Sequence, residues 1–232
     1  MAIAVLSGCS STVGGSAARD NSAVPVRDLA TVLPSLADVT RAAGNPLTYD
    51  GPAAIGGIDV LTNGIRDNDT ASPIECLGPV SPFMRVVYER GDIRAAAWQE
   101  FSNYADGQAV SSVNAGVVAF TSDGEAQRMF SAFVSQWKAC EGRTVTLHLP
   151  NVEIYEKVTA VEVDGSVLSA TVVHTDDQGD APFPIERSIG VAADCIVDVD
   201  AAVTGGTPEQ QRATGRATRL AATMLENITH RR

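Results

Sequence analysis

The sequence predicts an α+β domain in which an antiparallel sheet carries helices packed on one face. Strand-like segments follow one another in the second half of the chain without helices alternating between them, and such runs are typical of antiparallel sheets. Two further segments combine a helix-start signal with an apolar stripe at helical spacing. About 200 of the 232 residues follow a small, polar N-terminal stretch, which is enough for a single domain with a hydrophobic core.

Local signals define the elements of the first half of the chain. An apolar stripe after Pro34 predicts a helix over 34–43. The stretch 45–79 is rich in Gly, Pro, Asn and Asp and is expected to be irregular. Ser81-Pro82 predicts the start of a short helix, since serine favours the N-cap position and proline the first helical position.

Two strands and a long helix are expected next. The segments 93–103 and 110–120 have strand-like composition and are joined by a turn at 105–107. Ser122 and Glu125 form a capping box that begins a helix. The apolar face of this helix consists of Ala126, Met129, Phe130, Phe133, Trp137 and Cys140.

The rest of the chain is read as a meander of strands and a final helix. The strands are expected at 144–149, 151–163, 167–174, 183–191 and 195–199. Asp164-Gly165 is a two-residue hairpin signal between two of them. A capping box with a proline at the first helical position predicts that the last helix begins at Thr207. Its buried stripe is expected to be Ala213, Ala217, Leu220, Ala221, Met224 and Ile228.

The N-terminal Leu6-Ser7-Gly8-Cys9 is typical of a bacterial lipoprotein signal, in which cleavage occurs before a cysteine that carries a diacylglyceryl group. A complete signal has a charged region and roughly 7–15 apolar residues. The apolar stretch before the cleavage site consists only of residues 1–6, and no Lys or Arg precedes Cys9. A start codon assigned too late would explain this, so residues 1–8 are interpreted as a truncated signal segment. The alternative is a cytosolic chain with a chance match.

This interpretation sets the domain organisation. Residues 9–24 are a Gly/Ser-rich tether and residues 25–232 are the folded domain. Because no apolar run reaches the roughly 18 residues of a membrane span, attachment to the membrane is expected through lipid on Cys9. The protein is therefore expected at the cell membrane, on its extracytoplasmic face. A net charge of −11 disfavours a nucleic-acid partner.

No constellation of residues predicts catalysis. There is no G-x-S-x-G motif, and His148 and His174 lie on separate predicted strands, where solvent-facing side chains are expected. The segment 174–180 lacks the spacing of an EF-hand loop. We therefore expect no catalytic residue, no metal and no cofactor.

The cysteines offer a clearer signal. If Cys9 is lipidated, Cys76, Cys140 and Cys195 remain, and three thiols allow one disulfide. An exported chain permits such a bond. A bond between Cys76 and Cys140 would tie the irregular stretch to the long helix, and Cys195 would then be a buried thiol in an apolar strand.

Several features together resemble one family. They are the lipoprotein cysteine, Cys76 before a short Tyr-containing segment, an Ala-x-x-Met-Phe motif running into Trp137-x-x-Cys140, an Ile-Val-Asp-Val strand and a long C-terminal helix. This combination resembles the PknH-like extracellular sensor domain, which is found on a mycobacterial serine/threonine kinase and on many mycobacterial lipoproteins. The similarity covers roughly residues 29–228.

The resemblance implies a single α+β domain with a cleft that binds an unidentified ligand. It also implies a disulfide between Cys76 and Cys140. A second bond that is frequent in the family is not expected, because no cysteine closely follows Cys140.

The aromatic residues suggest where a cleft could lie. Trp98, Phe101 and Tyr104 are concentrated in one segment of a chain with only 5% aromatic residues. Strand alternation places Trp98 and Phe101 on opposite faces. We expect Phe101 in the core and Trp98 nearer the ligand, and the alternative is that Trp98 simply packs under a helix.

The predicted function is therefore that of a non-catalytic sensor-like module of the cell envelope. Its expected partner is a small molecule or another envelope component. Two alternatives remain open: a structural or protein-interaction lipoprotein, and an envelope hydrolase with an unrecognised site.

Overall fold

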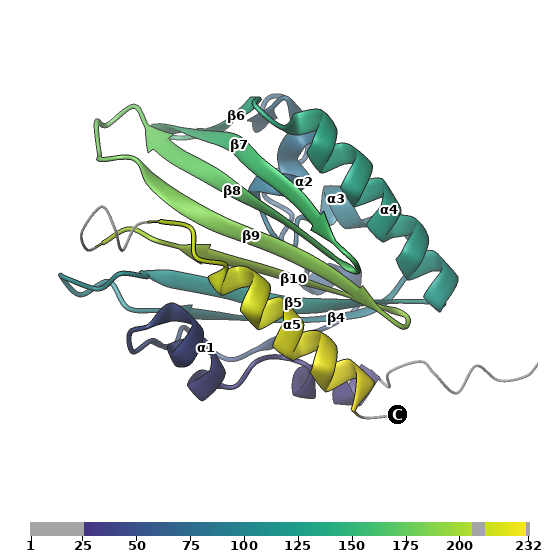
Figure 1. Ribbon diagram of the computed structural model, residues 1–232. Coiled ribbons are helices and arrows are strands. Elements are labelled where there is room, and N and C mark those ends of the chain that lie inside the picture. Colours follow the sequence, from purple (N-terminus) through teal and green to yellow (C-terminus); the bar gives the residue numbers. More distant parts are fainter. Residues whose placement is uncertain (1–25, 206–211, 231–232) are drawn as a thin grey trace, which may run out of the picture.

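The computed structural model describes residues 26–205 and 212–230 and shows a ten-stranded antiparallel sheet (Figure 1). The strands run in the order β1-β4-β5-β10-β9-β8-β7-β6-β3, with β2 also paired to β4. Their bounds are β1 (Thr48–Tyr49), β2 (Ala54–Gly56), β3 (Ala71–Ser72), β4 (Ile93–Ser102), β5 (Ser112–Phe120), β6 (Thr144–Leu149), β7 (Val152–Asp164), β8 (Val167–Asp176), β9 (Phe183–Ala192) and β10 (Cys195–Ala202).

The order of the strands follows from one long connection, which crosses the sheet between β5 and β6. The chain leaves β5, crosses the sheet through helix α4 (Asp123–Cys140) and begins β6 on the far side. It then returns strand by strand until β10 pairs with both β9 and β5. The predicted hairpin at Asp164-Gly165 joins β7 to β8, and Gly165 has the positive φ of 56° that such a turn requires.

The α+β class and the antiparallel sheet are confirmed, but the helices cover both faces rather than one. Helices α2 (Leu77–Val80), α3 (Arg85–Tyr88) and α4 pack on what we call the α4 face. Helices α1 (Leu36–Ala43) and α5 (Arg216–Thr229), together with the 3-10 helix Val26–Thr31, pack on the opposite α5 face (Figure 1).

The reason for two layers lies in the central strands. Val117 and Val118 on β5 point to opposite faces, and both are fully buried. The same holds for Ile196 and Val197 on β10. A sheet whose central strands are apolar on both faces must be covered on both.

Helix α1 begins two residues later than predicted, because Ser35 rather than Pro34 sets its start, whereas α4 begins at the predicted Ser122 signal. Ser35 caps α1, with the Asp38 backbone N–H donating to Ser35 Oγ at 3.2 Å and Asp38 accepting from the Ser35 N–H. Ser122 caps α4 by accepting from the Glu125 N–H at 3.1 Å. The entire predicted apolar face of α4 is buried, including Trp137 and Cys140.

The short helix predicted after Ser81 is present as α3, but its predicted start at Ser81 is wrong. Helix α2 ends at Val80, Ser81 follows it as the C-cap, and α3 begins only at Arg85. Between them Phe83 has a positive φ of 55° and is almost fully buried, stacked on Trp98 with ring centroids 5.9 Å apart. Burial of this aromatic ring therefore outweighs the local capping signal.

Helix α5 also begins later than predicted. The expected start at Thr207 lies outside the described residues, but residues 212–215 are described and are not helical. Ala213 is exposed, whereas the other residues of the predicted stripe are buried. Gly215, with a φ of 75°, leads into the first turn.

A carboxylate from the sheet caps this first turn. Glu186 on β9 accepts hydrogen bonds from the backbone N–H groups of Thr214, Arg216 and Ala217 and forms an ion pair with the Arg216 side chain at 2.6 Å. Negative charge is favourable at this end of a helix because the first N–H groups have no partner within the helix. Glu186 therefore decides where α5 begins.

Replacing Glu186 with Ala should strongly destabilise the domain. The change removes the carboxylate that pairs with the buried Arg216 side chain and accepts from several backbone N–H groups, and breaking a buried ion pair typically costs about 3–5 kcal/mol. Urea unfolding at neutral pH measures the loss. The matched control is Glu162→Ala, because Glu162 is exposed, and it should change stability by less than about 0.5 kcal/mol. Equal effects of the two substitutions would contradict the capping role.

Candidate functional site

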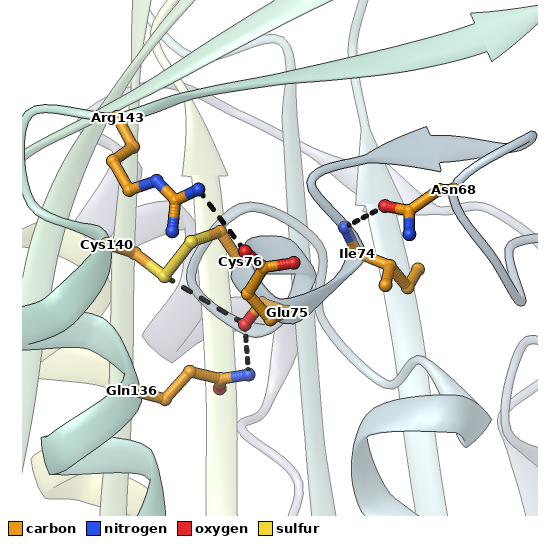
Figure 2. Close-up of a disulfide and its surroundings, with 7 residues drawn as sticks. All are labelled: Asn68, Ile74, Glu75, Cys76, Gln136, Cys140 and Arg143. Atoms are coloured by element: carbon orange, nitrogen blue, oxygen red, sulfur yellow. Dashed lines mark hydrogen bonds and ion pairs between the residues drawn. A yellow bond between two sulfur atoms is a disulfide. The ribbon is translucent and has the colours of Figure 1, made fainter.

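A disulfide joins the two parts of the α4 face, as predicted. Cys76 and Cys140 are bonded, with their Cα atoms 5.6 Å apart, so the start of α2 is linked to the end of α4 (Figure 2). Beside the bond, Gln136 Nε2 donates to the Glu75 carbonyl at 2.7 Å and Arg143 pairs with the Glu75 carboxylate at 3.2 Å (Figure 2). These contacts fix the end of the irregular stretch to the helix.

The third cysteine lies on the other side of the sheet. Cys195 is fully buried, as expected, and packs among the residues of the α5 face. Its Sγ lies 3.4 Å from Asp194 Oδ1. The sheet therefore separates Cys195 from the Cys76–Cys140 bond.

A buried charged cluster lies beneath α2 on the α4 face. The Arg187 side chain is fully buried and forms a 2.9 Å ion pair with Asp198. Its guanidinium also donates to the carbonyls of Gly78 and Pro79 at 3.2 and 3.1 Å. Tyr88 donates its hydroxyl to Asp198 at 2.9 Å. The cluster thus holds both α2 and α3 against the sheet.

Asp200, on the same face of β10, has a different environment. Only 8% of Asp200 is exposed, and its Oδ1 accepts two hydrogen bonds from Asn114, from the backbone N–H and from the side-chain amide, both at 3.0 Å. Burial raises the pKa of Asp200 to about 6, although the nearby Arg187 charge opposes the change. Asp200 is therefore an acid that changes charge in mildly acidic conditions.

Trp98 and Phe101 lie on opposite faces, as alternation predicted. Phe101 is fully buried in the core of the α5 face. Trp98 is half-buried on the α4 face, where its Nε1 donates to the Val60 carbonyl at 2.9 Å and its ring stacks on Phe83. Trp98 lines none of the four cavities seen in the described part of the chain, so its contact with a ligand stays a prediction.

His174 differs from expectation because it does not face solvent. Its Nδ1 lies 2.7 Å from Oε1 of the buried Glu156, and its ring stacks on Phe183 with centroids 4.3 Å apart. His148 lies on the other face of the sheet, 3.2 Å from Glu153, and is about one-third exposed at 35%. Within residues 26–205 and 212–230, no group of His, Cys, Asp or Glu has a metal-binding arrangement.

The largest of the four cavities lies on the α5 face. It has a volume of about 530 Å³ and lies between the start of α5 and strands β7 and β8. We call it the α5 groove. Its polar lining includes Glu162, Ser169, Thr171, Glu186, Thr218 and Arg219.

The charged side chains at the groove are either paired, held by hydrogen bonds or exposed at its rim. Glu186 is neutralised at its floor by Arg216. The Arg219 guanidinium is held in place because it donates to the carbonyls of Thr214 at 2.6 Å and Ala42 at 3.3 Å. Glu162 and Asp164 are exposed at the rim. The groove therefore offers a fixed guanidinium, hydroxyl groups and two solvated carboxylates to a bound molecule.

Sequence reasoning did not find the groove or the charged cluster. Glu186 and Arg187 are adjacent in the sequence, and nothing in the pattern of β9 shows that both are buried on opposite faces. Asp198 and Asp200 are two residues apart, which places them on one face of a strand, but this spacing alone does not show that either is buried or paired. The partners of these residues come from distant parts of the chain, so only the topology reveals the sites.

Comparison with known proteins agrees with this architecture. The model of the PknH-like extracellular domain matches residues 24–227. The chain belongs to this family. The crystal structure of the extracellular domain of PknH from Mycobacterium tuberculosis superposes with a TM-score of 0.75, and the match covers 90% of this chain and 98% of that one at 20% identity. The PknH-like fold is thus present over nearly the whole described chain.

Sequence relatives lead to the same family. The serine/threonine-protein kinase PknH of Mycobacterium tuberculosis (strain ATCC 25618 / H37Rv) is 30% identical over 116 residues, and PknH of Mycobacterium bovis is 29% identical over the same length. The match covers half of this chain but only 17% and 18% of these kinases. The family is that of an extracellular domain rather than a kinase catalytic domain, in agreement with an extracytoplasmic location. None of the described helices is long and apolar enough to span a membrane.

Loss of the disulfide should lower stability in this PknH-like domain. Replacing Cys140 with Ser removes a crosslink with a sequence separation of 64 residues, which the chain-entropy model values at on the order of 4 kcal/mol. The double variant Cys76→Ser/Cys140→Ser should cost about as much as the single change, since both remove the same bond. Urea unfolding measures the stability, and peptide mapping without reductant checks the pairing. Recovery of Cys195 bonded to either partner would contradict the assignment.

Replacing Asp200 or Asp198 on β10 with Asn should change the stability of the domain in opposite directions. The pKa of Asp200 is higher in the folded chain than its usual value of 3.8, so the folded state binds more protons than the unfolded state between about pH 4 and pH 6. Stability from this group is therefore fully present below pH 4 and is lost as pH rises to about 6.

Accordingly, Asp200→Asn should increase stability at pH 7 and flatten the pH dependence between pH 4 and pH 6. The matched change Asp198→Asn should instead cost about 3 kcal/mol or more, because it leaves the buried Arg187 charge without its partner. Urea unfolding at several pH values distinguishes the two. A loss of stability at pH 7 in Asp200→Asn would show that its carboxylate is favourably paired in the fold.

Proposed function

We propose that this protein is a non-catalytic, sensor-type lipoprotein of the cell envelope that binds a ligand in the α5 groove. A lipid on Cys9 anchors it to the extracytoplasmic face of the cell membrane, and residues 9–24 act as a tether. Cys9, the tether and the signal segment 1–8 lie outside the described residues. The proposal is supported by the lipoprotein motif and by membership of a family of extracellular domains.

The observation that carries the proposal is the geometry of the α5 groove. Its volume of about 530 Å³ lies within the range of about 300–1,000 Å³ that is usual for ligand sites. Its walls belong to different elements, with Thr171 on β8 and Thr218 on α5. The Arg219 side chain is already held by two carbonyls, so little ordering is needed on binding.

Binding is favoured over hydrolysis by the composition of the groove. Ser169 and Thr171 supply hydroxyl groups, but no histidine or cysteine is present among its described lining residues. A nucleophilic hydroxyl needs a base within hydrogen-bond reach. Glu186, the buried carboxylate at the floor, is already engaged with Arg216 and the first turn of α5.

A second candidate is a protein-interaction lipoprotein. The observation in its favour is the exposure of Tyr49 and Ile55, which are 53% and 47% accessible and lie on two short strands paired with β4. Exposed apolar side chains at a sheet edge are typical of contact sites for other proteins. If the double variant Tyr49→Ser/Ile55→Ser no longer binds a protein partner that the parent binds, although the groove is unchanged, this candidate is favoured.

The anchor is tested by mass spectrometry. Protein made in a mycobacterial host from a start that includes a complete signal should begin at Cys9 and carry a diacylglyceryl group. It should fractionate with membranes, whereas Cys9→Ala should not. A mature chain that retains an unmodified Met1 would contradict the proposed lipid anchoring at Cys9.

The groove is tested with envelope extracts of the same host. An extract fraction that contains the ligand should raise the unfolding temperature of the folded domain, because a ligand that binds only the native state stabilises it. Thr171→Arg fills the groove and should abolish this shift. Ser131→Arg, on the exposed side of α4, is the matched control and should keep it. If no fraction produces a shift, the proposed function is wrong.

A further inference from the structure

Among residues 26–205 and 212–230, no helix covers part of the sheet beside the α5 groove. Helix α5 lies mainly over β9 and β10, and the same side of β6, β7 and β8 is left uncovered by the drawn elements (Figure 1). We call this surface the open face. The side chains that share it are Thr144, Thr146, His148, Tyr155, Lys157, Thr159, Thr171, Val173 and Thr175. Thr171 belongs to both the open face and the groove, so the two surfaces are continuous.

The threonines of the open face present oxygen acceptors. Thr159 donates its hydroxyl proton to the carbonyl of Thr171 at 2.7 Å, and Thr175 donates to the carbonyl of Tyr155 at 3.3 Å. Because each hydroxyl has one proton but two lone pairs, these oxygens remain able to accept hydrogen bonds from a molecule on the surface. The open face is therefore suited to a ligand rich in hydroxyl donors.

Tyr155 provides a fixed ring among these hydroxyls. Its own hydroxyl donates to Glu153 Oε2 at 3.1 Å, and the other oxygen of Glu153 lies 3.2 Å from His148 Nδ1. The hydrogen bond to Glu153 raises the pKa of Tyr155, so the phenol stays neutral at physiological pH. Thr146 and Thr175 are its direct neighbours on the adjacent strands.

A half-buried aromatic ring flanked by oxygen acceptors is complementary to a sugar. The C–H face of a pyranose packs on an aromatic ring, while its hydroxyl groups donate to the surrounding oxygens. Tyr155 and Thr159 are four residues apart on β7, which corresponds to about 13 Å along the strand. A short oligosaccharide has the length to reach from Tyr155 into the groove at Thr171.

The negative charge of the domain favours uncharged saccharides over anionic ones. The chain has a net charge of −11, Glu153 lies beside Tyr155, and Glu162 and Asp164 are exposed at the rim of the groove. Lys157 on the open face and the Arg219 guanidinium in the groove are positively charged, but these two charges are fewer than the three carboxylates. A uronate or phosphorylated glycan would be repelled by these carboxylates.

We propose that the groove ligand is an uncharged oligosaccharide that packs on Tyr155 and extends across the open face into the α5 groove. This inference rests on the proposed function, since it names the chemical class of the ligand for the same groove.

The test is calorimetric titration of the folded domain with maltotriose, mannotriose and a trigalacturonate of equal length. At least one neutral trisaccharide should bind saturably, and the uronate should not. Tyr155→Ala should weaken binding about tenfold, in line with loss of one aromatic contact. Tyr155→Phe keeps the ring and should stay within about threefold of the parent. Tyr104→Ala removes an aromatic residue that is 71% exposed elsewhere and should have no effect.

A second variant covers the case in which Tyr155→Ala fails to fold. Thr146→Arg adds bulk beside the ring without removing it and should also abolish saccharide binding. Suppose that an envelope extract raises the unfolding temperature of the parent domain but not that of Thr171→Arg, while neither neutral trisaccharide binds. In that case the saccharide assignment is overturned and the proposed function stands. Preference for the uronate also overturns the assignment. Absence of both effects defeats the proposed function as well.

Discussion

Two adjacent charges on β9 hold the helical layers on opposite faces of the sheet. Glu186 points to the α5 face, where it caps α5 and pairs with Arg216. Arg187 points to the α4 face, where it pairs with Asp198 and binds the carbonyls at the end of α2. A buried charge is tolerated only when it is paired and hydrogen-bonded. Each helix layer must therefore lie where its backbone can satisfy one of these two residues.

The position of the α5 groove follows from this constraint. Because Glu186 fixes the first turn of α5 above β9, the helix packs on β9 and β10 and does not extend over β6 and β7. The uncovered strands can remain exposed because their side chains on that face are mostly hydroxyl-bearing or charged. On the α4 face, by contrast, α4 covers an apolar surface and the disulfide completes the layer.

Much of the fold was predictable because its signals are local. The Ser122 cap of α4, the Asp164-Gly165 hairpin and the strand alternation of Phe101 against Trp98 depend on neighbouring residues in the sequence. The failures share a different cause. The segment after Ser81 is bent by burial of Phe83, and α5 begins where a carboxylate from another strand caps it. The groove was not predictable because its walls meet only once the sheet is assembled.

The adjacency of Glu186 and Arg187 also connects the two faces physically. The α5 groove is lined by residues of the first turn of α5, which is bonded to Glu186. The next residue along the strand holds α2, whose start is linked to α4 through Cys76. Chains of packed and hydrogen-bonded groups of this kind are one physical route by which distant sites can be coupled. In this domain, a displacement of α5 by a ligand would act on the same short stretch of β9 that positions the disulfide-linked layer.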